Sequence, residues 1–208
     1  MAERILTVQG EARIKAEPDQ IVVNIKLTGK SKTIFESSQT LLRKLEHFYK
    51  DVDVLGFKRE EMKTKGIEIE EEINYLDSKR KFLGYLAITR IKLRFDFDKQ
   101  RLVQVLNALG SSRSEPELRL EFTLKDIEPF RKQLLEKAIQ NATANATVLA
   151  SASNVRLGNI IQIYYGKLDI NIRNMALGVT VGVDYDEFDI QPESLSLEDK
   201  VGVVWEIF

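Results

Sequence analysis

Two long segments in which apolar and polar residues alternate constrain the fold of this chain more than any other feature. Residues 67–75 alternate isoleucine with glutamate, and residues 82–97 alternate apolar residues with a basic row at 90–94. A period of two predicts half-buried strands, and the short polar connection 76–81 predicts that they pair as a hairpin. In that pairing we expect the acidic row 68–72 to face the basic row. Each opposite-charge pair across the strands would contribute roughly 0.2–1 kcal/mol and help to fix the register.

Further segments with a period of two predict strands, and segments with helical spacing of apolar residues predict three helices. The predicted strands cover 5–14, 21–27, 118–124, 161–165, 177–185 and 201–207. The predicted helices begin at a Thr33–Glu36 capping box, at an Asp98 N-cap and at an Asp126 cap, and end before Gly56, at Gly110 and near Asn154. We expect the acidic stretch 184–199 to form a loop.

The order β-β-α-β-β-α-β-α-β-β-β is rich in hairpins and lacks regular βαβ alternation. It predicts an α+β fold, with a largely antiparallel sheet packed against a long amphipathic helix and two further helices. We expect one domain over 3–208, and the loop 112–116 is the candidate point of subdivision.

Composition excludes several classes of function. Lysine and arginine number 31 and aspartate and glutamate 32, so the net charge is −1, and we expect no nucleic-acid partner. The chain has no cysteine and one histidine, which excludes disulfides, thiol nucleophiles and histidine-based metal clusters. Phosphate-binding glycine loops and nucleophile-elbow motifs are also absent from the sequence. We therefore expect no cofactor and favour a chain that is not an enzyme.

The sequence begins with a strand pattern rather than a basic stretch and an apolar run, and it has no window apolar enough to span a membrane. We therefore expect a cytoplasmic protein with no membrane span.

The residues that could form a site have ordinary structural interpretations as well. His47 lies on the first helix with no evident partner, and we interpret it as structural. Strand alternation explains the glutamates at 68–72. For one cluster of acidic residues a second interpretation, a site for a divalent cation, stays open, because such cations prefer oxygen ligands. That group consists of Asp184, Asp186, Glu187 and Asp189.

Two features could mediate contact with another protein chain. The first is a row of small residues at i, i+4 spacing on the longest helix, which consists of Ala138, Ala142, Ala146 and Ala150. The row could pack on the protomer's own sheet or on another protomer. The second is the predicted hairpin, whose charged tip is flanked by Tyr75, Leu76, Phe82 and Leu83. The tip could be solvated, or apolar side chains beside a polar rim could form an interface.

Several short motifs, spread over nearly the whole chain in a fixed order, resemble those of the SIMPL domain, also called domain of unknown function 541. They are Leu6-x-Val8-x-Gly10 followed by Pro18-Asp19, Gly84-Tyr85-x-Ala87, the alanine row followed by Leu157-Gly158, and Val201-x-Val203-x-Trp205. The resemblance implies an α+β fold, ring-like or channel-like homo-oligomers in some members, a link to stress defence and, through the family's eukaryotic namesake, binding of a protein partner. It supplies no catalytic residue.

Two hypotheses follow. The first is a non-enzymatic module that forms homo-oligomers or binds a protein partner through sheet edges, the hairpin or the alanine-rich helix. The second is an enzyme or small-molecule-binding protein with a carboxylate and tyrosine site between helix and sheet, using residues such as Tyr164 and Tyr165. The scarcity of residue types common in catalysis favours the first hypothesis.

Overall fold

The computed structural model describes residues 4–59, 62–76, 79–166, 177–178 and 191–208. They form two compact units. Unit 1 comprises Met1–Pro18, Leu124–Asn174 and Glu193–Phe208, and unit 2 comprises Asp19–Thr123 and Met175–Pro192. The α+β class and the order of elements predicted from the sequence are confirmed. The strands are divided between two antiparallel sheets.

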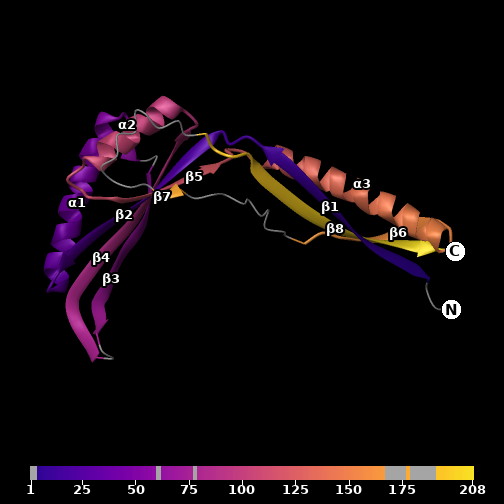
Figure 1. Cartoon of the computed structure of the whole chain (residues 1–208), viewed down its shortest axis with the longest axis horizontal. Helices are drawn as coiled ribbons and strands as arrows, with labels where there is room; N and C mark the ends of the chain where they lie inside the picture. The colour runs from indigo at the N-terminus through magenta and orange to yellow at the C-terminus, as the bar shows by residue number, and fades with distance from the viewer. Residues whose placement is uncertain (1–3, 60–61, 77–78, 167–176, 179–190) are drawn as a thin grey trace. The chain divides into compact units, whose positions relative to one another are not determined.

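Unit 1 is a three-stranded sheet covered on one face by the longest helix (Figure 1). Its elements are β1 (Ile5–Ala16), α3 (Glu128–Ala152), β6 (Leu157–Tyr164) and β8 (Leu195–Ile207). The sheet has the order β1-β8-β6, so β1 and β6 are its edges. Its core contains inward residues of β1 and β8, including Trp205, packed against α3.

The helix α3 lies close to β1 because both contribute very small residues at the contact. The alanine row of α3 is almost fully buried in the core of unit 1. Opposite it, a Cβ added at Gly10 would meet the carbonyl oxygen of Ala138 at 2.0 Å and the Cβ of Ala142 at 2.7 Å. The helix begins at Glu128, two residues after the predicted cap. Asp126 still accepts a hydrogen bond from the Glu128 amide at 2.9 Å.

The final strand is longer than the sequence predicted. Residues 195–199, expected to be the end of an acidic loop, belong to β8. Leu195 and Leu197 face the core with the same parity as Val201, and β8 pairs with β1 along its whole length from Leu195 to Glu206. Of the rest of the predicted loop, residues 191–194 lie outside any helix or strand, and residues 184–190 lie outside the described residues.

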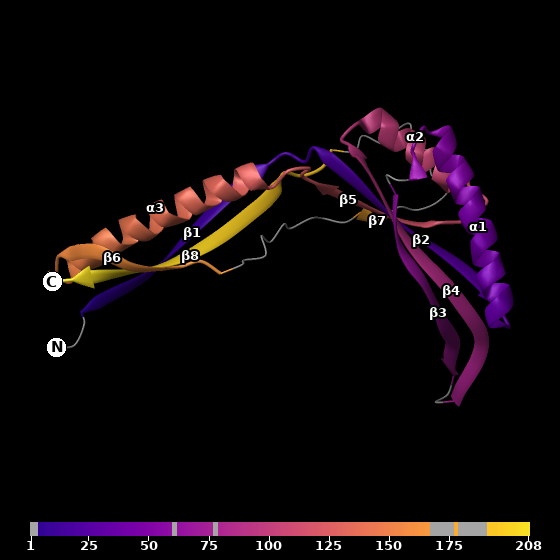
Figure 2. The ribbon, with the colours of Figure 1, turned by 180° about the vertical axis from the view of Figure 1, so that it is seen from behind.

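Unit 2 is a five-stranded sheet with the order β3-β4-β2-β5-β7, and its helices cover one face (Figures 1 and 2). Its elements are β2 (Gln20–Ser31), α1 (Ile34–Val54), β3 (Met62–Leu76), β4 (Lys79–Asp96), α2 (Lys99–Gly110), β5 (Glu117–Thr123) and β7 (Leu177–Gly178). Both predicted caps are confirmed, since Thr33 accepts from the Glu36 amide at 3.2 Å and Asp98 from the Arg101 amide at 3.1 Å. The predicted strand 177–185 is described only over 177–178.

The predicted β3–β4 hairpin forms, but the expected pairing of its charged rows was wrong. β3 starts at Met62 and contains an irregularity at Gly66, which has a positive φ of 28° and interrupts the pairing between Lys65 and Ile67. Glycine suits this backbone conformation, and the buried Thr89 hydroxyl donates to the Gly66 carbonyl at 2.9 Å. Glu68, Glu70 and Glu72 lie opposite Ile88, Leu86 and Gly84, a register that includes a second irregularity between Glu72 and Ile73, and among the described residues only the diagonal Arg90–Glu68 pair joins them to the basic row.

Candidate functional site

The face of unit 2's sheet opposite to the helices carries closely spaced basic residues. On β3 and β4, Lys63 lies directly opposite Lys92, and Lys65 lies directly opposite Arg90. The next strand continues the first of these rows with Asn24, which pairs with Lys92. On its other side Asn24 pairs with Arg119 of β5. The row Lys63–Lys92–Asn24–Arg119 therefore crosses four neighbouring strands.

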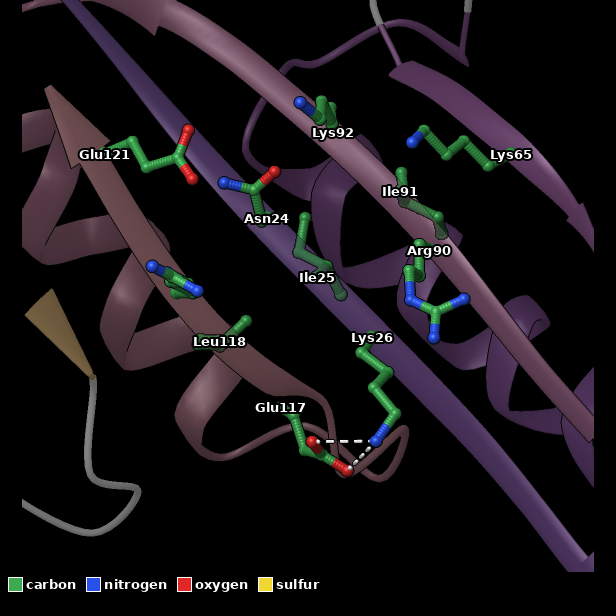
Figure 3. Close-up of a pocket in the computed structure, with 11 residues that line it drawn as sticks. Asn24, Ile25, Lys26, Lys65, Arg90, Ile91, Lys92, Glu117, Leu118 and Glu121 are labelled. Atoms are coloured by element: carbon green, nitrogen blue, oxygen red, sulfur yellow. Dashed lines mark hydrogen bonds and ion pairs between the residues drawn. The ribbon is translucent and has the colours of Figure 1, made fainter. Parts of the chain in front are cut away.

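An open pocket of about 510 Å³ lies on this face, which we call the basic pocket (Figure 3). Its lining includes five cationic side chains and two carboxylates, an excess of three positive charges. The lining residues are Asn24, Ile25, Lys26, Lys65, Arg90, Ile91, Lys92, Glu117, Leu118, Arg119 and Glu121. None of them is aromatic. The pocket therefore offers charge and hydrogen-bond donors rather than rings on which a base could stack.

Carboxylates neutralise only part of this charge. Lys26 donates to both Glu117 oxygens at 3.1 Å, as Figure 3 shows. Arg90 pairs diagonally with Glu68, which raises the pKa of the guanidinium through a hydrogen bond and through its charge. Five further cations of this face form no ion pair within the described part of the chain. They are Lys63, Lys65, Lys92, Arg94 and Arg119.

A polar group in the pocket also lacks a partner among the described residues. The side-chain nitrogen of Asn24 is inaccessible to solvent and makes no hydrogen bond there. Figure 3 draws Asn24 between Lys92 and Glu121, with its side-chain nitrogen on the side of Glu121. A buried donor without an acceptor costs free energy that an incoming acceptor would recover. The sequence identified the basic row of β4. It missed the pocket because Lys63 and Lys65 precede the segment in which alternation is visible.

A second feature is the open edge of β6 in unit 1. No described strand pairs with the outer edge of β6. Five apolar or aromatic residues of this segment each expose between 45% and 54% of their surface, and residues 157–166 carry no charge. The five are Ile160, Ile161, Ile163, Tyr164 and Tyr165. The opposite edge, β1, carries Glu11, Arg13 and Lys15, the kind of charged side chains that protect an edge from pairing.

The structure separates the residues that the sequence selected as contacts. It buries the alanine row of α3 in the core of unit 1, so the row packs on the protomer's own sheet. Phe82 is half exposed, Leu83 is partly buried, and the Phe82 ring meets Tyr85 edge-on at 5.2 Å. Tyr75 and Leu76 end β3, and their side chains lie outside the described part of the structure.

The tyrosines proposed for a helix–sheet site do not converge on a reactive group. The Tyr164 hydroxyl donates to Gln162 at 2.8 Å. The Tyr165 hydroxyl lies 3.5 Å from a carboxylate oxygen of the buried Asp199, a long and weak hydrogen bond. Burial, followed by the charge of Asp199, raises the pKa of Tyr165. The pocket beside Asp199 has a volume of about 200 Å³.

The carboxylates that were candidates for metal ligands either form ion pairs or lie outside the described residues. Ion pairs hold Glu71 to Arg80 and Glu72 to Lys30. In the part of the chain that the structure describes, no three His, Asp or Glu side chains gather closely enough to hold a metal ion. His47 is half-buried on α1. The cluster Asp184, Asp186, Glu187 and Asp189 lies outside the described residues.

Comparison with known families matches residues 6–205 to SIMPL, described as "Protein of unknown function (DUF541)". The chain belongs to the SIMPL family. No curated protein matches it. The SIMPL description assigns no activity. Among the helices described here, none combines the length and the apolar character needed to cross a membrane.

Proposed function

We propose that this SIMPL chain is a non-enzymatic module that assembles with a second copy of itself through the outer edge of β6. The observation that carries the proposal is that this edge is unpaired within the described chain, apolar on both faces and free of charge. Exposed, uncharged edge strands readily pair with another strand. The resemblance to SIMPL members that form homo-oligomers supports the same conclusion.

The chemistry of β6 favours a second copy as its occupant. Two β6 edges related by a two-fold axis would run antiparallel and extend the sheet from three strands to six, which satisfies backbone groups on both edges. Because 157–166 has no charged residue, this self-pairing brings no like charges together. The five half-exposed side chains would lose further apolar surface to water in the same contact.

The energies indicate a reversible assembly. Complete burial of a large apolar side chain is worth about 1.5–3 kcal/mol, and each of the five is already half buried, so the strip contributes at most on the order of 5 kcal/mol per copy and about 10 kcal/mol per dimer. Association itself costs an estimated 4–15 kcal/mol. Full burial of both strips is therefore similar in size to this cost, and backbone pairing must supply the net stabilisation. We expect the average molecular mass in solution to rise with protein concentration.

Sedimentation velocity over a wide concentration range tests the proposal. We expect a dimer or larger species for the unaltered chain and a shift towards monomer for Ile161→Lys and for Ile163→Lys. Val148→Lys is the matched control, because Val148 is an exposed apolar residue on α3 of the same unit. A monomer at every concentration, or an unchanged mass in both β6 variants, would overturn the proposal. The fluorescence of Trp205 verifies that each variant is folded.

The hairpin contact expected from the sequence is a separable part of the proposal. The half-exposed Phe82 beside the hairpin tip supports it. Deletion of residues 76–81 should reduce the mass of the assembly if the hairpin takes part in the contact between copies. An unchanged mass would show that the hairpin is not part of the interface. The alanine row is buried within the protomer, so the proposed interface does not use it.

The alternative is small-molecule binding or catalysis at Tyr165 and Asp199. Its support is that these two groups, distant in sequence, share a hydrogen bond. The pocket that Asp199 helps to line has a volume of about 200 Å³, smaller than the roughly 300–1,000 Å³ typical of ligand sites, and Tyr165 does not line it. The geometry therefore favours assembly over this alternative.

A further inference from the structure

We propose that the basic pocket of unit 2 binds a compact polyanion that carries two or more phosphate groups. The proposal is independent of assembly through β6, because the pocket is built from strands of the other unit. The residues that would contact the ligand are Lys65, Lys92, Arg119 and Asn24.

The pairing of like charges on this face is the first support. Lys63 opposite Lys92 and Lys65 opposite Arg90 are direct cross-strand pairs of equal charge, and such pairs destabilise a sheet. Among the described residues only Arg90 of these four has a carboxylate partner. A bound anion would convert this repulsion into attraction. The anion-free pocket is therefore strained in a way that a polyanion relieves.

The unpartnered amide of Asn24 is the second support. Its register places it between Lys92 on β4 and Arg119 on β5. An anion oxygen that lies over this row could accept from both cations directly, and from the buried Asn24 nitrogen once that side chain turns outward. Arginine adds a planar fork that suits phosphate, and lysine acts as a point charge. The row thus combines three donors of the kind that phosphate recognition requires.

The dimensions favour a small ligand over a nucleic acid. Neighbouring strands lie about 4.8 Å apart, so the distance from β3 to β5 is roughly 14 Å. That distance corresponds to only about four base pairs at 3.4 Å per step. The absence of aromatic lining also removes the stacking that drives single-strand binding. The volume of about 510 Å³ lies within the range of small-molecule sites.

The carboxylates of the lining limit where the ligand can lie. Glu117 is already paired with Lys26. Glu121 is on β5 opposite Val22, one row away from Asn24 and Arg119. We therefore expect the anion to lie over the Lys92–Asn24 part of the pocket, where Lys65 can also reach it. This local excess of positive charge is invisible in a net charge of −1.

Calorimetric titration of the full chain with inorganic tripolyphosphate tests the proposal. We expect saturable binding of one anion per chain that weakens with added salt, and a rise in melting temperature with tripolyphosphate. The double variant Lys92→Gln, Arg119→Gln should weaken binding at least about tenfold. Lys132→Gln, Lys137→Gln is the matched control, because it removes two exposed lysines of α3 in the other unit, and it should bind as the unaltered chain does.

Two further readouts separate the outcomes. Without anion, Lys92→Gln should melt at or above the unaltered chain, because it removes a repulsive pair. A labelled single-stranded oligonucleotide should bind more weakly than tripolyphosphate. No saturable heat, equal loss of binding in both double variants, or tighter binding of the oligonucleotide through Lys92 and Arg119 would each overturn the proposal.

Discussion

Replacement of Gly10 by alanine tests how closely α3 lies on its sheet. The new Cβ would be 2.0 Å from the Ala138 carbonyl oxygen and 2.7 Å from the Cβ of Ala142. Since a Cβ essentially never comes within 3.0 Å of another heavy atom, strand and helix must move apart by about 1 Å. The colliding oxygen belongs to the backbone of α3, so no change of rotamer can relieve the contact.

The size of the effect follows from that displacement. A gap of about 0.5–1 Å between packed surfaces forfeits a quarter to a half of their dispersion energy, and an overfilled core typically costs about 1–3 kcal/mol. Because the displacement affects several turns of a 25-residue helix, we expect the upper end, about 3 kcal/mol. For a chain of this length the melting temperature would fall by about 6–12 °C.

Urea unfolding followed by the fluorescence of Trp205 measures this loss. Trp205 is the sole tryptophan of the chain and lies in the same core as the Gly10 contact. Gly110→Ala is the matched control, because a Cβ at the end of α2 would have nothing within 4 Å and alanine is the better helix former. The control should be at least as stable as the unaltered chain. An unchanged unfolding midpoint for Gly10→Ala would refute the packing argument.

Two titrations provide further predictions. Burial and the charge of Asp199 raise the pKa of Tyr165, so Asp199→Asn should lower it part of the way in a spectrophotometric titration assigned with Tyr165→Phe. The folded pKa exceeds the unfolded one, so this contribution to stability is complete below about pH 10 and is lost as the pH rises through the folded pKa. A hydrogen bond and the charge of Lys44 lower the pKa of Glu115, and Lys44→Met should raise it in an NMR titration. That contribution is present above the unfolded pKa of about 4.3 and is lost as the pH falls through the folded pKa. An unchanged titration in either variant would contradict the assigned cause.

The two candidate sites differed in how far the sequence could predict them. The apolar character of 161–165 was visible as a strand, but its position at an unpaired edge depends on pairing with β8, about forty residues further along the chain. The charged residue types of the basic pocket were visible too. The acidic row was expected opposite Arg90 and Lys92, whereas Lys63 and Lys65 lie there, because the extra residue at Gly66 shifts these two lysines onto that face.

Local physics allowed the sequence by itself to determine the elements of this protein. Period-two alternation, helical spacing and two caps each depend on neighbours within a few residues, and they predicted the order of strands and helices. Only the tertiary structure decided that the strands form two sheets, that the alanine row fills a core, and that Lys92, Asn24 and Arg119 share one row. These features depend on register between segments far apart in the chain, and a shift of one residue moves a side chain to the opposite face.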